Sequence, residues 1–232
     1  MDYFCRLKEV KRTGWVAKLN LDDSESVSDH TLSMVVLALL FAELNKYSLS
    51  KTLKIIKMIL IHDLAESIIG DLTPESDMAK EKAYLENKAM KKILSEMPSV
   101  AIGNTFLRLW REYTKNETFE SQFVHLIDKL DMVIQAKYYV KTNGKLSKRQ
   151  INPFLISALE YSTKMNNTIN NKATTTTGAA GVTTSYDKNK DSATTVSGNK
   201  ERGFSHKTNF SLRKSQDRDL EYIKEILIQL CK

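Results

Sequence analysis

Residues 62–71 carry the side chains best suited to chemistry in this chain. Within this segment His62 lies four residues before Glu66, and Asp63 lies three residues before it. These spacings bring side chains to one face of a helix. An imidazole and two carboxylates beside buried neighbours cost free energy unless a partner neutralises their charge. We therefore expect a divalent cation at this group of residues.

Apolar residues before the group predict the helix that positions it. Leu53, Ile56, Ile59 and Leu60 recur at intervals of three and four residues. This periodicity predicts one mostly buried helix over residues 50–69. We expect all three ionisable side chains to lie on one face of that helix.

Gly70 and Pro74 mark the end of this helix. A proline disfavours helical backbone at the residue before it, so the chain turns here. Asp71 is therefore predicted at the C-terminal corner of the helix, beside the ionisable group. A strongly charged helix that follows, over residues 76–97, is expected to be peripheral.

A second histidine precedes an apolar helix upstream. Ser28 or Asp29 is the predicted N-cap of this helix, which runs to about Asn45. His30 lies in its first turn, where a single histidine is more often a capping or core residue. The histidine on the next helix makes His30 a candidate metal ligand.

A third apolar helix, predicted over residues 119–139, adds a carboxylate. Asp128 directly follows two apolar residues, so it can lean toward the core. Asp131 and His125 lie on the same helix as alternative participants. From these residues alone, the choice among the three stays open.

The N-terminal region offers a guanidinium and an indole. Residues 3–19 begin with apolar residues at helical spacing, and Gly14 is expected to end that helix. Arg12 and Trp15 would then lie in a short connection, where Arg suits a phosphate and Trp a flat or sugar surface. A surface Arg and a core-edge Trp is the simpler interpretation.

Composition limits the class of protein. The chain has 232 residues, of which 41% are hydrophobic, which suits one domain with a core plus an appendage. Cys5 and Cys231 lie at opposite ends, which fits a reducing compartment. We see neither a signal peptide nor an uninterrupted apolar run of membrane length, so we expect a cytoplasmic protein with no membrane association.

The net charge of +7 is unevenly distributed. Between Lys164 and Lys214, nine Lys or Arg residues face three acidic residues, so the rest of the chain is close to neutral. We find no basic helix interleaved with aromatic residues. No nucleic-acid binding is therefore expected through the folded domain.

Composition also divides the chain into three parts. Residues 1–165 are predicted to form one domain. Residues 166–214, rich in Thr, Asn, Ser, Gly and Lys, are predicted to be a disordered low-complexity insertion. Residues 215–232 are amphipathic and are expected to dock on the domain as a last helix. The predicted fold class is all-α.

The residues singled out above resemble a known family. His30, His62-Asp63 and Asp128 match the H…HD…D pattern of HD-domain metal-dependent phosphohydrolases. The surrounding motifs are similar to the 5′-deoxynucleotidase branch of that family over about residues 1–165. The matching motifs are Arg12-Thr13-Gly14-Trp15, Glu25-Ser26-Val27-Ser28-Asp29-His30, His62-Asp63-Leu64-Ala65-Glu66, Gly70-Asp71 and Asp128-Lys129-Leu130-Asp131-Met132.

The resemblance implies an HD-domain helical bundle, usually dimeric, that hydrolyses deoxyribonucleoside 5′-monophosphates. It implies that Glu66 is the catalytic acid/base residue and that one divalent metal ion is bound, cobalt, manganese or magnesium first, with zinc or iron also open. The implied metal ligands are His30, His62, Asp63 and Asp128. The implied substrate-binding residues are Arg12, Trp15 and Asp71.

Two alternatives remain open. HD-type hydrolases of triphosphates, cyclic nucleotides or alarmones would be expected to need extra basic residues near the site, whereas this sequence offers mainly Arg12. A non-catalytic helical binding module is the other alternative. The intact Glu66 argues against it.

Overall fold

The computed structural model describes the backbone of residues 2–177 and 206–231, and the side chains of residues 2–164, 218 and 220–231. Within these ranges the regular secondary structure is helical, apart from one isolated antiparallel bridge between Lys11 and Ser26. This confirms the all-α fold class. The helices are α1 (Asp2–Arg6), α2 (Thr13–Leu19), α3 (Val27–Leu44), α4 (Leu49–His62), α5 (Glu66–Ile69), the 3₁₀ turn η1 (Ala79–Glu81), α6 (Lys82–Ser95), α7 (Val100–Lys115), α8 (Phe119–Thr142), α9 (Lys148–Thr177) and α10 (His206–Cys231).

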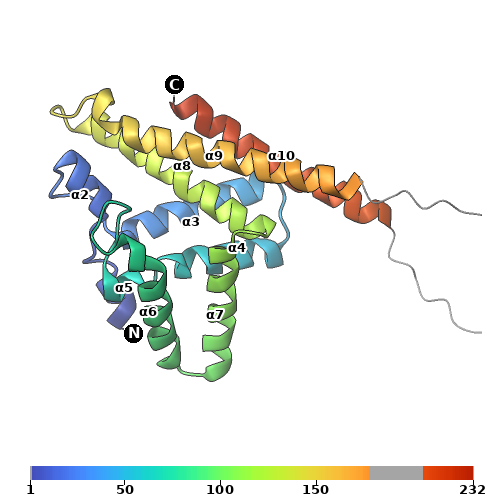
Figure 1. Cartoon of the computed structure of the whole chain (residues 1–232), viewed down its shortest axis with the longest axis horizontal. Coiled ribbons are helices and arrows are strands. Elements are labelled where there is room, and N and C mark those ends of the chain that lie inside the picture. Colours follow the sequence, from blue (N-terminus) through green and yellow to red (C-terminus); the bar gives the residue numbers. More distant parts are fainter. Residues whose placement is uncertain (1, 178–205, 232) are drawn as a thin grey trace, which may run out of the picture.

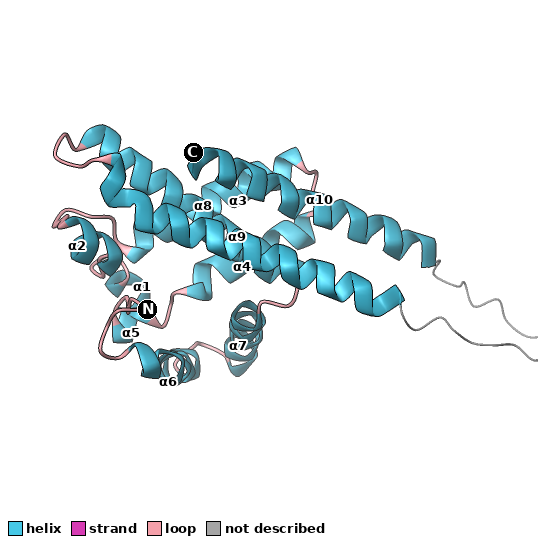
Figure 2. Ribbon diagram, turned by 45° about the horizontal axis from the view of Figure 1, so that its top comes forward, coloured by secondary structure: helices cyan, strands magenta, loops and turns pink. Residues whose placement is uncertain are grey.

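Helix α8 is at the centre of the fold, because α3, α4, α7, α9 and α10 all pack against it (Figure 1). Helices α6 and α7 form a pair that projects from this bundle, while α9 and α10 run side by side along it (Figure 2). The inward side of α8 is fully buried and forms much of the core. Its buried apolar residues are Phe123, Val124, Leu126, Ile127, Leu130, Val133 and Ala136.

The predicted single helix over 50–69 is wrong in one respect. Helix α4 ends at His62, and a separate short helix, α5, begins at Glu66. Between them the backbone tightens to hydrogen bonds between residues three apart, from Leu64 to Ile61 and from Glu66 to Asp63. His62 and Glu66 are therefore on different helices that meet at a corner.

The N-terminal prediction is also corrected. Gly14 and Trp15 lie inside α2. The helix predicted from residue 3 is interrupted before Gly14, between Arg6 and Thr13, where Lys11 forms an isolated bridge with Ser26. The N-cap of α3 is Ser26. Its hydroxyl accepts a hydrogen bond from the Asp29 amide while Asp29 accepts one from the Ser26 amide, which is a capping box.

The last helices extend beyond their predicted limits. Helix α9 continues to Thr177 and α10 begins at His206, so both reach into the stretch predicted to be a disordered insertion. Residues 178–205 of that stretch lie outside the described residues. Helix α10 packs into the core through Leu220, Ile223 and Leu227.

Helix α3 is apolar on all sides. Met34, Ala38 and Phe41 face the core, yet the opposite face exposes Leu32, Val36, Leu39, Leu40 and Leu44. By length and composition alone α3 could cross a membrane, although it packs against α4 and α8 as a core helix does. We call the five exposed side chains the α3 apolar face.

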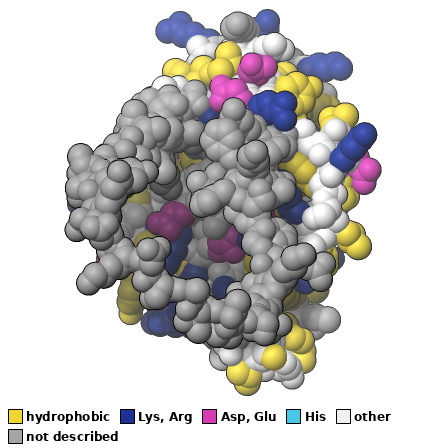
Figure 3. Space-filling view, turned by 90° about the vertical axis from the view of Figure 1, so that its right-hand side faces the viewer, with side chains coloured by type: hydrophobic (Ala, Val, Ile, Leu, Met, Phe, Trp, Pro, Cys, Tyr) yellow, Lys and Arg dark blue, Asp and Glu magenta, His cyan; other side chains and the backbone are white. Residues whose placement is uncertain are grey.

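The end of the molecule seen in Figure 3 has a mixed surface. Lys and Arg side chains there are interspersed with Asp and Glu, and apolar side chains lie between them (Figure 3).

Candidate active site

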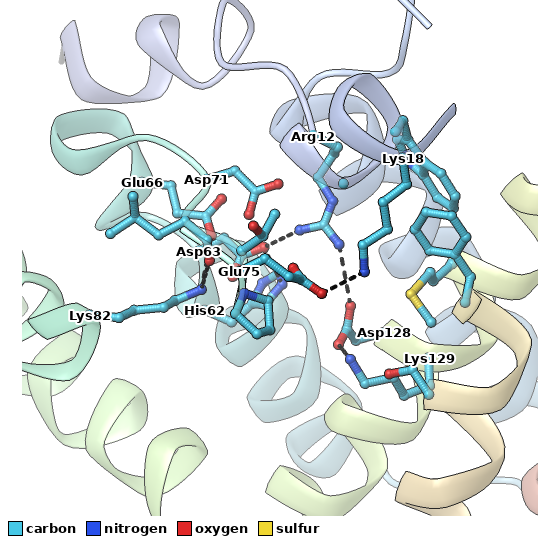
Figure 4. Close-up of a pocket in the computed structure, with 18 of the residues that line it drawn as sticks. Arg12, Lys18, His62, Asp63, Glu66, Asp71, Glu75, Lys82, Asp128 and Lys129 are labelled. Carbon is cyan, nitrogen blue, oxygen red and sulfur yellow. Dashed lines mark hydrogen bonds and ion pairs between the residues drawn. The ribbon is translucent and has the colours of Figure 1, made fainter. Parts of the chain in front are cut away.

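The corner between α4 and α5 opens into a cavity of about 700 Å³. Helices α2, α6, α7, α8 and α9 complete its walls. Figure 4 shows that the labelled charged side chains converge on it from several of these elements. Its volume is in the range of small-molecule sites. Of the predicted site residues, Arg12, Trp15, His62, Asp63, Glu66, Asp71 and Asp128 line it.

Two buried imidazoles lie close together at this end of the cavity, with ring centroids 5.7 Å apart: His62 lines the cavity, whereas His30 is not among the lining residues. His62 Nδ1 donates a hydrogen bond to the Ile59 carbonyl at 2.6 Å, and His30 Nδ1 lies 2.7 Å from Asp131 Oδ2. The Nε2 atoms of both rings are buried and face carboxylates. His62 Nε2 lies 2.9 Å from Asp63 Oδ2 and His30 Nε2 lies 3.3 Å from Asp128 Oδ1, although neither contact has hydrogen-bond geometry. Fixing Nδ1 in this way is how proteins orient a histidine whose other nitrogen binds a metal.

Two carboxylates complete the donor set. A ring nitrogen of His30, a ring nitrogen of His62 and a carboxylate oxygen of Asp63 all lie within 4.8 Å of one another. Asp128 Oδ1 is 3.3 Å from His30 Nε2. We call these four residues the metal cluster, meaning the candidate ligands of a single metal ion. Two imidazoles and two carboxylates fit a transition-metal ion better than Ca²⁺, which prefers oxygen ligands alone.

The alternatives from α8 are placed differently. Asp131 is buried behind His30, where it accepts hydrogen bonds from His30 and from the Ser33 hydroxyl. His125 stacks on Tyr113, with ring centroids 4.1 Å apart, and its Nε2 donates to the Tyr113 carbonyl at 3.1 Å. Asp131 therefore supports the metal cluster from outside, while His125 is packed away from it.

Arg12 lies between the two carboxylates of the metal cluster (Figure 4). Its Nη1 is 3.4 Å from Asp63 Oδ2, and its Nη2 is 3.8 Å from Asp128 Oδ1. Burial would raise the pKa of both carboxyl groups. For Asp63, electrostatic interaction with His62 and Arg12 outweighs burial and holds the pKa well below its usual range. Lys129 and His30 have the same effect on the pKa of Asp128.

The pKa of His30 is raised to about 9. Burial and the nearby Arg12 lower it, but Asp128 and Asp131 outweigh them. A bound cation would replace the proton on Nε2, since metal binding to histidine releases protons.

Glu66 is buried at the N-terminus of α5, with 3% of the residue exposed. Its Oε2 has no hydrogen-bond partner among the described residues. Burial raises the pKa of Glu66 well above its usual range, and the negative charges of Asp63 and Asp71 raise it further. Both effects favour the protonated form of the Glu66 carboxyl group.

Trp15 and Asp71 are tied to the scaffold as well as lining the cavity. The Trp15 indole donates a hydrogen bond to Glu25 Oε1 at 2.7 Å and packs on Phe154, with ring centroids 4.2 Å apart. Only 2% of Trp15 is exposed, so it forms a wall rather than a free surface. Asp71 accepts a hydrogen bond from the Thr13 amide at 2.8 Å.

Several lining residues were not identified from the sequence. Trp110 and Tyr113 of α7 contribute aromatic surface, and three lysines also reach the cavity, Lys18, Lys82 and Lys129. The expectation that Arg12 is the main cation is therefore wrong. Each lysine lies within ion-pair distance of a carboxylate, as their lines in Figure 4 show. Lys18 and Lys82 lie outside the motifs quoted above, whereas Lys129 lies in the motif Asp128-Lys129-Leu130-Asp131-Met132, which assigned it no role.

The HD domain family model matches residues 4–170, and the chain belongs to this family. The fold agrees with solved structures. The PH0347 protein from Pyrococcus horikoshii is 28% identical with a TM-score of 0.56, and the alignment covers 73% of this chain and 94% of that one. A conserved hypothetical protein from Pyrococcus furiosus is 33% identical with a TM-score of 0.52, covering 68% and 94%.

Relatives with a named activity come from distant eukaryotes. The 5′-deoxynucleotidase HDDC2 of Dictyostelium discoideum is 38% identical over 151 residues, which cover 62% of this chain and 77% of that protein. The mouse protein of the same name is 36% identical over 148 residues, covering 62% and 70%. The 5′-deoxynucleotidase YGK1 of Saccharomyces cerevisiae is 35% identical over 149 residues, covering 62% and 67%.

Proposed function

We propose that this chain is a metal-dependent phosphomonoester hydrolase that converts deoxyribonucleoside 5′-monophosphates to deoxynucleosides and phosphate. The observation that carries this proposal is the agreement of relatives from an amoeba, a mammal and a yeast, all named 5′-deoxynucleotidase, at 35–38% identity. The metal cluster and the protonatable Glu66 beside it supply the groups that such a reaction needs.

The metal cluster is the proposed site of one divalent cation, with cobalt, manganese or magnesium the expected ions and zinc or iron also compatible. When bound there, the cation polarises the phosphoryl group and lowers the pKa of a water ligand. His30 and His62 offer Nε2 lone pairs once deprotonated, and their Nδ1 contacts keep the rings in place. Asp63 and Asp128 offer negative charge that is retained at neutral pH because their pKa values are lowered.

Glu66 is the proposed acid/base residue. Ester cleavage leaves negative charge on the 5′ oxygen of the nucleoside, and this oxygen needs a proton. Glu66 lies on the next helix after His62, and its raised pKa lets it hold that proton before the bond breaks. Once deprotonated, it can accept a proton from the attacking water.

Arg12, Asp71 and Trp15 are the proposed substrate contacts. Arg12 can offset charge on the phosphoryl oxygens. Asp71 lines the cavity, and its carboxylate can accept a hydrogen bond from a sugar hydroxyl. The wall formed by Trp15 can crowd the 2′ position and so disfavour ribose.

A substrate panel tests the proposal. Phosphate release should be measured with deoxy- and ribonucleoside monophosphates, deoxynucleoside triphosphates and cyclic nucleotides, each with added cobalt, manganese or magnesium. We expect release from the deoxynucleoside monophosphates. Phosphate release mainly from a triphosphate or a cyclic nucleotide would overturn the substrate assignment. No phosphate release from any compound would favour a non-catalytic binding module.

We also propose that the protein acts in the cytoplasm as a homodimer. The α3 apolar face supports the dimer, because five exposed leucine and valine side chains on one helix are typical of a surface that another protein covers. A second copy of the chain offers an identical face, and a two-fold symmetric contact buries both. The free cysteines, Cys5 and Cys231, are compatible with a reducing compartment.

A further inference from the structure

Lys82 connects three parts of the cavity wall. It is the first residue of α6, and its Nζ donates a hydrogen bond to the Leu72 carbonyl at 2.9 Å. The same Nζ lies 3.7 Å from Glu86 Oε1 and 4.0 Å from Glu66 Oε1. In Figure 4 the Lys82 side chain runs from the wall toward Glu66, on the opposite side of the cavity from Lys129.

The contact with Leu72 concerns the segment that carries Asp71. This segment leaves α5 through Gly70, which has a φ of 76° that only glycine adopts without strain. Asp71 is held on one side by the Thr13 amide, and Leu72 is held on the other by Lys82. The two hydrogen bonds fix the segment relative to α2 and α6.

The contact with Glu66 has an electrostatic role. Glu66 is buried near Asp63 and Asp71, which both disfavour its charged form, while Lys82 and Arg12 favour it. Because Arg12 also lies between Asp63 and Asp128, Lys82 is the cation that faces Glu66 without contacting the metal cluster in the described residues.

We propose that Lys82 is a positioning residue for the reaction, which holds the Glu66 carboxyl group and the Asp71–Leu72 segment in their working geometry. This inference rests on the proposed function. An ordinary ion pair along a helix, between Lys82 and Glu86, would explain only one of its three contacts. Only 35% of the Lys82 side chain is exposed, and it lines the cavity rather than the outer surface of α6.

The test compares kcat and KM for hydrolysis of a deoxynucleoside monophosphate by the wild type and three variants. Lys82→Met removes the charge and the donor, and we expect kcat to fall by about 10- to 100-fold, as small misplacements of catalytic groups do. Lys82→Gln retains a donor for Leu72, and Lys82→Arg retains the charge. Lys88→Met, an exposed lysine on the same helix, is the matched control and should leave kcat unchanged.

A second comparison separates positioning from loss of structure. If Lys82 acts through Glu66, Lys82→Met should change the residual rate by less than about twofold in a Glu66→Gln background, because coupled residues are non-additive. We also expect Lys82→Arg to recover most of the kcat.

An equal loss in both backgrounds would overturn the role of Lys82 through Glu66, and full activity of both Lys82→Met and Lys82→Gln would overturn the inference as a whole. If Lys82→Met fails to fold, kcat is compared for Lys82→Gln and Lys82→Arg instead, each with Glu66 intact and with Glu66→Gln. A wild type that releases no phosphate would contradict the proposed function itself, and the inference would fall with it.

Discussion

His30 and His62 each have one ring nitrogen that is held in a hydrogen bond and one that faces a carboxylate of the metal cluster. Their Nδ1 atoms contact Asp131 and the Ile59 carbonyl, while their buried Nε2 atoms lie 3.3 Å from Asp128 Oδ1 and 2.9 Å from Asp63 Oδ2 without hydrogen-bond geometry. A buried nitrogen that makes no hydrogen bond costs free energy. A metal ion bound between these imidazoles and carboxylates, as proposed above, would satisfy both nitrogens at once.

At the residue scale, the role of Glu66 can be tested by replacing its ionisable carboxyl group with an amide. Glu66→Gln keeps the size and polarity of the side chain but can neither donate nor accept the proton, so kcat should fall by about 10²- to 10⁴-fold. Metal content, measured by elemental analysis, should stay at the wild-type level because Glu66 is outside the metal cluster. A variant that retains wild-type kcat would show that another group moves the proton.

The sequence identified the residues that occur in local motifs. The candidate ligands and Glu66 were found because each lies next to an apolar helix or in a short polar segment. The sequence analysis did not identify Lys82, Lys18 and Tyr113. These residues extend into the cavity from other helices, and the local spacing of residues does not show which side chains meet in the folded protein. The roles of Asp131 and Asp128 could be distinguished only once the position of His30 was known.

At the scale of the element, apolar periodicity predicted the helices but not the turn that shapes the site. Residues 63–65 contain no Gly or Pro, so nothing in the sequence marks the end of α4. Helix α3 is apolar all round, so its periodicity could not show which face is buried. Both features depend on tertiary packing rather than on local sequence.

The α6–α7 pair depends on one close backbone approach. Gly103 of α7 is buried, and a Cβ atom there would lie 2.6 Å from the Leu94 carbonyl oxygen of α6. Gly103→Ala must therefore push the helices apart, and we expect the free energy of unfolding to fall by about 1–3 kcal/mol. Urea denaturation followed by circular dichroism measures this change.

Gly144 provides the control for that substitution. No atom lies within 4 Å of a Cβ built there, so Gly144→Ala should change the free energy of unfolding by less than about 0.5 kcal/mol. Equal stability of the Gly103→Ala and Gly144→Ala variants would contradict a tight α6–α7 contact. Because Trp110 and Tyr113 of α7 line the cavity, Gly103→Ala should also raise KM.

At the scale of the whole molecule, the α3 apolar face predicts the oligomeric state. Light scattering coupled to size-exclusion chromatography should give twice the protomer mass of 26.5 kDa for the wild type. The double variant Val36→Glu, Leu40→Glu places charges in the middle of the face and should give the protomer mass.

Tyr84→Glu is the matched control, because Tyr84 is an equally exposed side chain on α6. This variant should keep the dimer mass. A wild type that runs as a monomer, or a double variant that remains dimeric, would contradict the assignment of the α3 apolar face to dimer formation.

The metal dependence of phosphate release tests the central claim most directly. The full-length protein is stripped with a chelator, incubated with a deoxynucleoside monophosphate, and assayed for free phosphate before and after addition of cobalt, manganese or magnesium. We expect no release from the stripped protein, recovery with at least one of these ions, and no recovery for His62→Ala. Full activity of the stripped protein, or of His62→Ala, would contradict a reaction that depends on the metal cluster.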